Sequence, residues 1–438
     1  MTGQTLPIDP RGFMVLHRFL LASAAVAVAT HPAGAQTPAQ DPAMATAIRV
    51  LRSSPLIDGH NDLPWHIRES PEARGSVESY DLRRRTTGHT DLARLRAGML
   101  GGQFWSIYIP GEIGDSGYAR VQLEQIDIAR QMIAKYPEAF QWALTADGMR
   151  QAFAAGRIGS VLGLEGGHAI ENSLGALRVY YDMGARYMTL THNVTLDWAD
   201  AALDQPRHGG LTAFGAEVVR EMNRLGMLVD LSHVSPGTMS DALNVTEAPV
   251  IFSHSGPRAL VDHPRNVPDS ILRRLPANGG VVMVPFVTSF VSPAVWAHDQ
   301  ARDRQAASLR QRHGSDSMSV RRELEAWDRA NPAPVARLSD VADAIDYVRR
   351  VAGVDHVGIG SDFDGITETI EGLEDVATFP ALFAELARRG WSEADLRKLA
   401  GENVLRAMSR AEEVSTRLRR ERGPSTRTIR ELDGKPEA

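Results

Sequence analysis

Cysteine is absent from the 438-residue sequence. This absence excludes disulfide bonds, thiolate metal sites, a cysteine nucleophile and a lipid anchor attached through cysteine. Any metal ion bound by side chains must therefore be held by histidine, aspartate and glutamate.

Long hydrophobic runs are also missing. The most apolar stretch, residues 19–29, is shorter than the roughly 20 residues that a membrane-spanning helix requires. Basic residues precede this stretch and small residues follow it at 33–35, which is the order found in a secretory signal peptide. We expect residues 1–35 to be a cleaved signal peptide and the mature protein to be periplasmic or secreted, without a membrane span. A membrane anchor or a buried helix is the alternative.

Positive charge is not in excess, since the formal net charge is -6. No basic stripe interleaved with aromatic residues is present, so a nucleic-acid partner is not expected. With 43% hydrophobic and 23% charged residues, the chain can form a large folded core.

Short apolar and β-branched runs alternate with helical patterns from about residue 44 onward, as in parallel βαβ units. Eight runs are more than the five or six strands usual in an open doubly wound sheet, and a phosphate-binding glycine loop is missing. We therefore expect an α/β fold, a closed (β/α)8 TIM-like barrel over residues 36–410. The predicted strands are residues 55–60, 102–109, 158–165, 186–192, 227–233, 249–254, 280–286 and 356–362. The predicted helices include residues 119–136, 146–155, 173–183, 211–225, 268–275 and 339–352.

Two segments depart from this alternation. An insertion at about residues 288–337 is long and charged and contains a predicted helix at 320–330. A loop of this length after a barrel strand is either a lid over the site or a plain surface insertion. Residues 411–438 are rich in arginine and glutamate and are expected to form a charged tail that frays or forms a solvated helix.

Six of the eight predicted strands end in or just before a residue that can bind metal or transfer a proton. One such histidine alone is more often a core residue than a ligand. Apolar strands gain nothing from ending repeatedly in imidazole or carboxylate, however, because burying such groups is costly unless they are paired or bound to metal. The carboxyl ends of barrel strands converge on one mouth, so these side chains are expected to meet there. The residues are His60 with Asp62, Glu165, His192, His233, His254 and Asp362.

Histidine and carboxylate ligands suit Zn²⁺, with Mn²⁺ or Co²⁺ also compatible. The number of ligands predicts two ions per chain. His60 and Asp62 lie two residues apart and project to the same side of an extended strand. His233 and His254 arrive from adjacent strands, and Glu165 is placed to bridge.

Two divalent ions about 3.5 to 4 Å apart would hold a bridging hydroxide, which is a nucleophile that needs neither serine nor cysteine. His192 and Asp362 then remain to polarise the substrate carbonyl and to transfer a proton to the leaving group. The predicted reaction is hydrolysis. The other histidines are expected to be surface or loop residues, namely His66, His89, His208, His263, His298 and His313.

Several short motifs resemble those of the membrane (renal-type) dipeptidase family, a branch of the metal-dependent amidohydrolase superfamily. They occur in the order of that family between about residues 50 and 408. The motifs are IDGHNDLPW at 57–65, GLEGGH at 163–168, TLTHN at 189–193, LSHVS at 231–235, FSHS at 252–255, RNVPD at 265–269 and GSDFDG at 360–365.

The resemblance implies a dipeptidase with two zinc ions and small dipeptide substrates. His60 and Asp62 are implied to bind one ion, and His233 and His254 the other, with Glu165 bridging both. A homodimer is also expected, because relatives form one.

The same resemblance implies roles in substrate binding. His192 is implied to contact the scissile carbonyl side, Arg265 to bind the C-terminal carboxylate, and Asp362 to serve the free amine or the leaving nitrogen. A guanidinium group suits the carboxylate role because it binds a carboxylate through two parallel hydrogen bonds.

The sequence departs from the family in several ways. Vertebrate-like members carry cysteines and a lipid anchor. Neither feature is expected here, which implies a soluble bacterial-type enzyme. The apolar residues Val287 and Phe290 lie where polar or aromatic pocket residues are expected, so substrate preference stays open. The alternative is an enzyme in which the same metal pair hydrolyses an N-acyl amino acid, a lactone or a β-lactam. A non-catalytic peptide- or metal-binding protein is a third hypothesis, which the complete ligand set disfavours.

Overall fold

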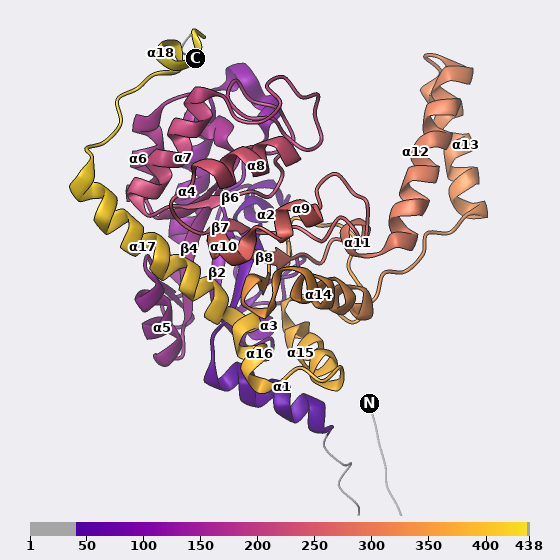
Figure 1. The fold of residues 1–438 in the computed structure, drawn as a ribbon. Coiled ribbons are helices and arrows are strands. Elements are labelled where there is room, and N and C mark those ends of the chain that lie inside the picture. The colour runs from indigo at the N-terminus through magenta and orange to yellow at the C-terminus, as the bar shows by residue number, and fades with distance from the viewer. Residues whose placement is uncertain (1–40, 436–438) are drawn as a thin grey trace, which may run out of the picture. The chain divides into compact units, whose positions relative to one another are not determined.

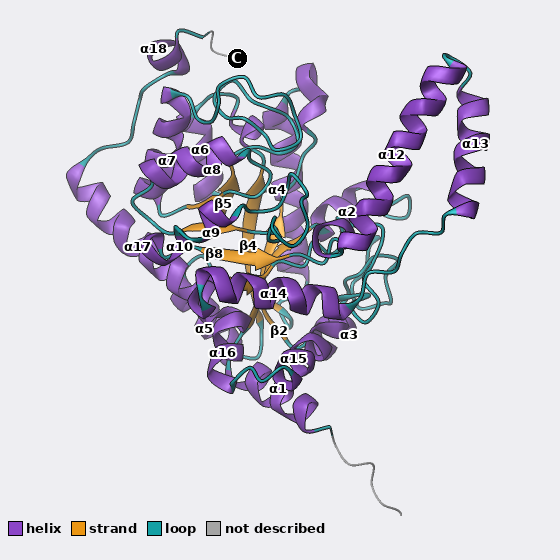
Figure 2. Cartoon of the chain, turned by 45° about the vertical axis from the view of Figure 1, so that its right-hand side comes forward, coloured by secondary structure: helices purple, strands orange, loops and turns teal. Residues whose placement is uncertain are grey.

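The computed structural model describes residues 41–435, and the predicted signal peptide at 1–35 lies outside the described residues. Parallel strands form a barrel surrounded by helices (Figures 1 and 2). The strands are β1 (Leu56–Asn61), β2 (Leu100–Ser106), β3 (Phe140–Trp142), β4 (Ile158–Glu165), β5 (Ala185–Thr189), β6 (Leu228–Asp230), β7 (Val250–Phe252), β8 (Val281–Val284) and β9 (Val357–Ile359). Their order is β2-β1-β9-β8-β7-β6-β5-β4-β3, and pairing of β2 with β4 closes the ring. This confirms the predicted (β/α)8 TIM-like barrel.

Each predicted strand overlaps one of the eight barrel strands, and β3 is a short additional strand that was not predicted. It pairs with residues 158–160 of β4. Residues 162–165 of β4 pair with β5 on the same side of that strand. Several strands end earlier than predicted, for example β6 at Asp230 and β9 at Ile359. The residues beyond them turn away from the sheet, because His233 and Asp362 adopt left-handed backbone angles of φ 67° and φ 68°, which a continuing strand does not allow.

Helices cover the outside of the barrel, and most of the predicted ones are present. The prediction of one helix over residues 268–275 was wrong, because two short helices occupy this region; Pro276 lacks the N–H group that a continuous helix needs. The helices are α1 (Pro42–Ser53), α2 (Leu63–Glu69), α3 (Leu92–Ala97), α4 (Tyr118–Lys135), α5 (Ala146–Ala154), α6 (Leu174–Asp182), α7 (Ala213–Leu225), α8 (Pro236–Val245), α9 (Asp269–Leu272), α10 (Leu275–Asn278), α11 (Thr288–Val291), α12 (Pro293–His313), α13 (Ser317–Ala330), α14 (Leu338–Ala352), α15 (Phe379–Arg388), α16 (Glu393–Arg397), α17 (Asn403–Glu421) and α18 (Ile429–Asp433).

The insertion contains three helices. Its predicted helix at 320–330 lies within α13, which pairs with α12 as a hairpin that extends away from the barrel (Figures 1 and 2). The long helix α12 was not predicted, because it buries few residues, among them Ala306 and Leu309, and shows no continuous apolar stripe.

The predicted boundary at residue 410 falls inside α17. Beyond it, Ala411, Val414 and Leu418 are buried, and the Ser415 hydroxyl donates to the carbonyl of Arg224 at 2.7 Å. The first part of the predicted tail therefore packs against the barrel domain instead of fraying, because its apolar residues recur at helical spacing on one face.

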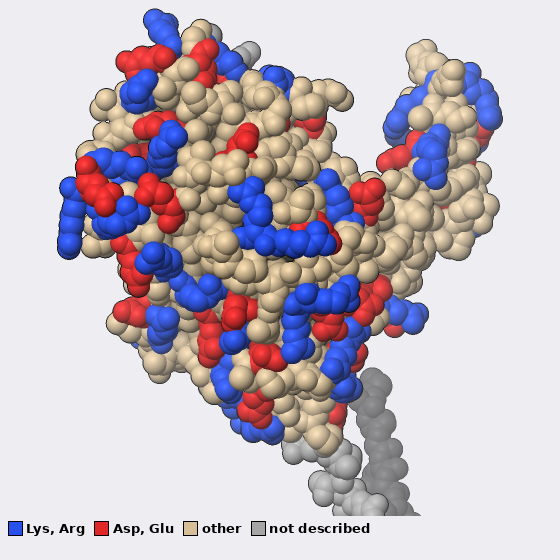
Figure 3. All heavy atoms as spheres, in the orientation of Figure 1, with Lys and Arg blue, Asp and Glu red and all other residues tan. Residues whose placement is uncertain are grey.

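Charges of both signs are intermixed on the face shown in Figure 3, where blue and red side chains alternate over the helices. This distribution differs from the single-sign stripe that a nucleic-acid surface requires. Among residues 41–435, no helix combines the length and the hydropathy that crossing a membrane demands.

Candidate metal centre

The predicted ligands come from the carboxyl ends of different barrel strands. His60 lies in β1 and Glu165 is the last residue of β4, while His233 lies three residues after the end of β6 and His254 two residues after the end of β7. Asp62 occupies the N-cap position of α2, but its side chain makes no capping hydrogen bond. All five side chains are buried, so the barrel brings them to one place that is largely shielded from solvent.

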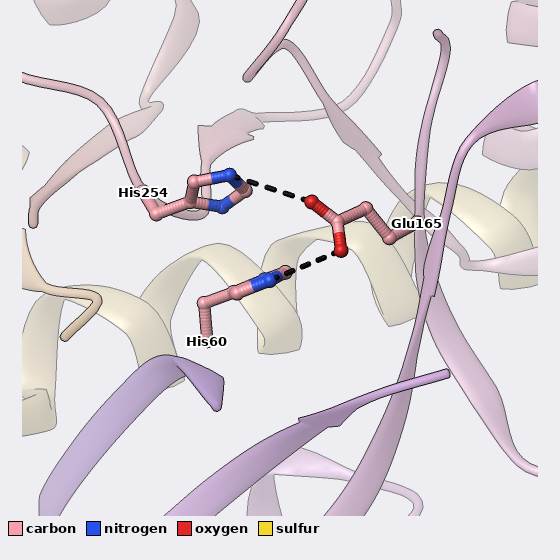
Figure 4. Close-up of side chains that lie close together, drawn as sticks. All are labelled: His60, Glu165 and His254. Atoms are coloured by element: carbon pink, nitrogen blue, oxygen red, sulfur yellow. Dashed lines mark ion pairs between the residues drawn. The ribbon is translucent and has the colours of Figure 1, made fainter. Parts of the chain in front are cut away.

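Glu165 stands at the centre of this group. Its Oε2 atom is 3.2 Å from Nε2 of His60, and its Oε1 atom is 3.1 Å from Nε2 of His233 and 3.5 Å from Nε2 of His254. Figure 4 shows His60 and His254 pointing toward the two oxygens of this carboxylate. Asp62 Oδ2 lies 3.3 Å from Nε2 of His60. One carboxylate thus faces ligands on two sides, which is the arrangement that a bridging residue needs.

The hydrogen bonds behind two of the histidines determine which ring nitrogen carries the proton. His233 Nδ1 lies 2.9 Å from the side-chain oxygen of Asn193, which can only accept, so this nitrogen donates. His254 Nδ1 lies 2.8 Å from the Ser253 hydroxyl, which gives its own proton to Asp230 Oδ2 at 2.6 Å. Both Nε2 atoms are consequently left as lone pairs that face the centre.

These facing atoms fit metal ions better than they fit one another. Nε2 of His233 and Nε2 of His254 are only 2.9 Å apart, and burial lowers the pKa of both rings well below the usual value, so neither ring carries a second proton at neutral pH. His60 Nε2 and Asp62 Oδ1 are buried without a hydrogen bond. These side chains form groups that could hold a metal ion, and imidazole with carboxylate is a donor set that suits zinc.

Two further buried aspartates brace the strand ends. Asp230 accepts hydrogen bonds from the backbone N–H and the hydroxyl of Ser253 at 2.8 and 2.6 Å. Asp58 accepts the same pair of bonds from Ser361 at 2.7 and 2.6 Å, and burial raises its pKa to about 6. Sequence reasoning did not single out these residues. Each aspartate ties a ligand-bearing strand to its neighbour and so restrains the positions of the ligands.

The two substrate-binding candidates, Arg265 and Asp362, lie beside this group. Arg265 is 2% exposed, and among the side chains that the structure describes, in residues 41–113 and 117–435, no carboxylate oxygen lies within ion-pair distance of its guanidinium group. Burial lowers the pKa of Arg265 to about 10, so it is still charged at neutral pH. Burial raises the pKa of Asp362 well above its usual value. His192 Nε2 lies 4.0 Å from Glu165 Oε1, and burial lowers its pKa.

A cavity of about 440 Å³ opens over this group and is lined by all of the predicted site residues except His60. Its size suits a small ligand, not a polypeptide. Val287 and Phe290, at the base of the insertion, form part of its wall, as does His263. His263 is a loop residue, as expected, but its side chain is buried and faces this cavity instead of the surface. Other lining residues are Trp65, Tyr108, Asn193, Leu203 and Ile366.

Comparison with known proteins shows which family the chain belongs to. Residues 44–422 match the family described as membrane dipeptidase (Peptidase family M19). Solved structures agree. The probable dipeptidase PvdM of Pseudomonas aeruginosa is 25% identical, with a TM-score of 0.74 over 85% of this chain and 99% of that one. A metallopeptidase of Rhodobacter sphaeroides, liganded with a phosphinate mimic of the dipeptide L-Ala-D-Ala, is 26% identical, with a TM-score of 0.66 over 82% and 99%. Dipeptidase AC, another metallopeptidase of this family, is 27% identical, with a TM-score of 0.68 over 82% and 98%. The chain therefore belongs to the membrane dipeptidase family.

Proposed function

We propose that the protein is a zinc-dependent dipeptidase that holds two ions per chain. The observation that carries the proposal is the position of Glu165, which has His60 and Asp62 on one side and His233 and His254 on the other. The chemistry that a bound zinc pair supplies is activation of water and polarisation of the scissile carbonyl. The residues around it bind and orient the substrate.

Arg265 binds the C-terminal carboxylate of the dipeptide. Its guanidinium group is buried and charged, and a substrate carboxylate supplies the ion-pair partner that the described residues do not. Buried charge is stable only when it is paired, so this site favours substrates that end in a free carboxylate.

Asp362 acts on the amine or the leaving nitrogen of the substrate, and His192 acts on its carbonyl oxygen. The raised pKa of Asp362 makes its carboxyl group able to hold a proton and to exchange it with the amine or the leaving nitrogen. His192 is neutral, because burial lowers its pKa, and it can give one hydrogen bond to the substrate carbonyl oxygen. Bond cleavage then leaves two free amino acids.

The relative that is liganded with a phosphinate mimic of L-Ala-D-Ala supports the extension to D-configured C-terminal residues. We propose that this chain also accepts them. Export through a signal peptide at 1–35 and assembly into a homodimer stay predictions.

Purified protein loaded with zinc and assayed against a dipeptide panel tests the proposal. We expect about two zinc ions per chain and hydrolysis of Ala-Ala and Ala-D-Ala. N-acetyl-Ala serves as the discriminating substrate, because it has a carboxylate and an amide but no free amine. Hydrolysis of N-acetyl-Ala alone would favour the alternative amidohydrolase, and failure to hydrolyse any of the three with zinc present would overturn the proposal.

A further inference from the structure

We infer that the base of the insertion forms an apolar subsite in which Phe290 and Val287 select dipeptides whose C-terminal residue carries an apolar side chain. This inference rests on the proposed dipeptidase function and adds a substrate preference to it. Both residues line the cavity that is also lined by Arg265 and by four of the five proposed metal ligands, Asp62, Glu165, His233 and His254.

The position of Phe290 relative to Arg265 determines which substrate group it meets. The guanidinium carbon of Arg265 lies over the Phe290 ring, 5.2 Å from its centroid. In an amino acid the carboxylate carbon and Cβ are bonded to the same Cα and are about 2.5 Å apart. A carboxylate held by Arg265 therefore brings the side chain of the same residue close to Phe290.

The backbone of Phe290 is fixed to the loop that carries Arg265. The side-chain amide of Asn266 donates to the Phe290 carbonyl at 2.9 Å, and its oxygen accepts from the N–H of Gly256 at 3.0 Å. A Cβ atom at Gly256 would lie 2.9 Å from the Phe290 carbonyl oxygen and 2.8 Å from the Asn266 oxygen. Glycine is thus required for this close approach, and the insertion base has little freedom to move away from Arg265.

The Phe290 side chain packs against a neighbouring aromatic ring, which in turn packs against a second one. The His263 ring centroid lies 4.4 Å from that of Phe290 and 4.3 Å from that of Trp296 in the first turn of α12. Trp296 Nε1 donates to the carbonyl of Asp262 at 3.1 Å. Burial lowers the pKa of His263 to about 4, so its ring is uncharged. The row from Phe290 through His263 to Trp296 is therefore a neutral, restrained wall.

This wall discriminates by the cost of removing water. An apolar side chain placed against Phe290 and Val287 is stabilised by leaving water. A polar side chain of the same size loses its hydrogen bonds to water and finds no charged group on these two residues to replace them. Discrimination of this kind in an apolar pocket reaches about tenfold to 200-fold in kcat/KM.

The test compares Ala-Leu with Ala-Asn, whose C-terminal side chains are nearly equal in size. We expect the zinc-loaded wild type to favour Ala-Leu by about tenfold or more in kcat/KM. The variants Val287→Thr, which replaces a methyl group by a hydroxyl, and Phe290→Ser should both lower this ratio. Ala-Gly, which has no side chain at this position, measures whether each variant is still folded and active. Trp327→Ala is the matched control, because Trp327 lies in α13 of the same insertion and packs at a tilt against the ring of His298.

The outcomes separate the two proposals. A ratio near one in the wild type, or a ratio that neither variant lowers while Ala-Gly is still hydrolysed, would overturn the apolar subsite and leave the dipeptidase proposal intact. An equal loss of preference in Trp327→Ala would also overturn it, because the effect would then belong to the whole insertion. If the zinc-loaded wild type hydrolyses none of the three dipeptides, the proposed function fails and the inference fails with it.

Discussion

Replacing Arg265 by methionine is expected to separate substrates with a free C-terminal carboxylate from those without one. Methionine keeps an unbranched apolar stem but lacks the guanidinium group, and with it the charge and the hydrogen-bond donors. Arg265 is 2% exposed, and it has no carboxylate partner among the side chains that the structure describes. In the complex, the substrate carboxylate is therefore its ion-pair partner in a site that largely excludes water.

Removing one member of a buried, hydrogen-bonded charge pair costs about 2 to 5 kcal/mol. This corresponds to a loss of about 30-fold to about 4,000-fold in kcat/KM for Ala-Ala. Ala-Ala amide lacks the negative charge, so Arg265→Met should lower its hydrolysis far less. The two substrates and two proteins form a cycle in which the coupling between Arg265 and the carboxylate is measured directly.

Steady-state kinetics on the zinc-loaded proteins, with zinc content measured for both, provides the assay. Asp269→Asn, at the first residue of α9 and four positions after Arg265, is a matched control, since Asp269 pairs with Arg273 on the outside of the barrel. Equal losses for the free and amidated substrates would refute the assignment of Arg265, as would an unchanged kcat/KM for Ala-Ala.

Three further changes are expected to give distinct results. Asp362→Asn should retain zinc and lower kcat by about 10²- to 10⁴-fold, because it removes the proton-transferring carboxyl group; parental turnover would contradict that role. Ser253→Ala removes the hydrogen-bond partner of His254 Nδ1 and should weaken zinc binding by about 10- to 100-fold in a chelator competition; unchanged affinity would show that this contact is dispensable. Leu418→Ala should lower the free energy of unfolding by about 2 to 5 kcal/mol, because Leu418 is fully buried in α17; a change near zero in denaturant titration would restore the expectation of a solvated tail.

The clustering of the proposed metal ligands could be predicted from the sequence because barrel topology determines where strand ends meet. Recognition of eight alternating units was enough to bring His60 and His254 to one mouth, although 194 positions separate them. The predicted ends of the strands were less accurate. His233 and Asp362 lie beyond the last paired residues, since their left-handed backbone angles depend on local contacts that no periodicity reveals.

The partners behind the ligands could not be predicted in the same way. Tyr187 reaches His60 Nδ1 with its hydroxyl at 2.8 Å, and Ser361 reaches Asp58 across 303 positions of sequence. In the sequence alone, neither Tyr187 nor Ser361 can be distinguished from a residue without such a hydrogen bond, because its partner becomes a neighbour only in the closed barrel. The helix α12 was missed for another reason, since a helix that projects from the domain needs no apolar stripe along its length.

Anomalous scattering from a crystal grown with zinc would test the central claim most directly. We predict two zinc peaks on either side of the Glu165 carboxylate, one beside His60 and Asp62 and the other beside His233 and His254. No peak at Glu165, or a single ion bound without one of these pairs, would contradict a two-ion centre in this protein.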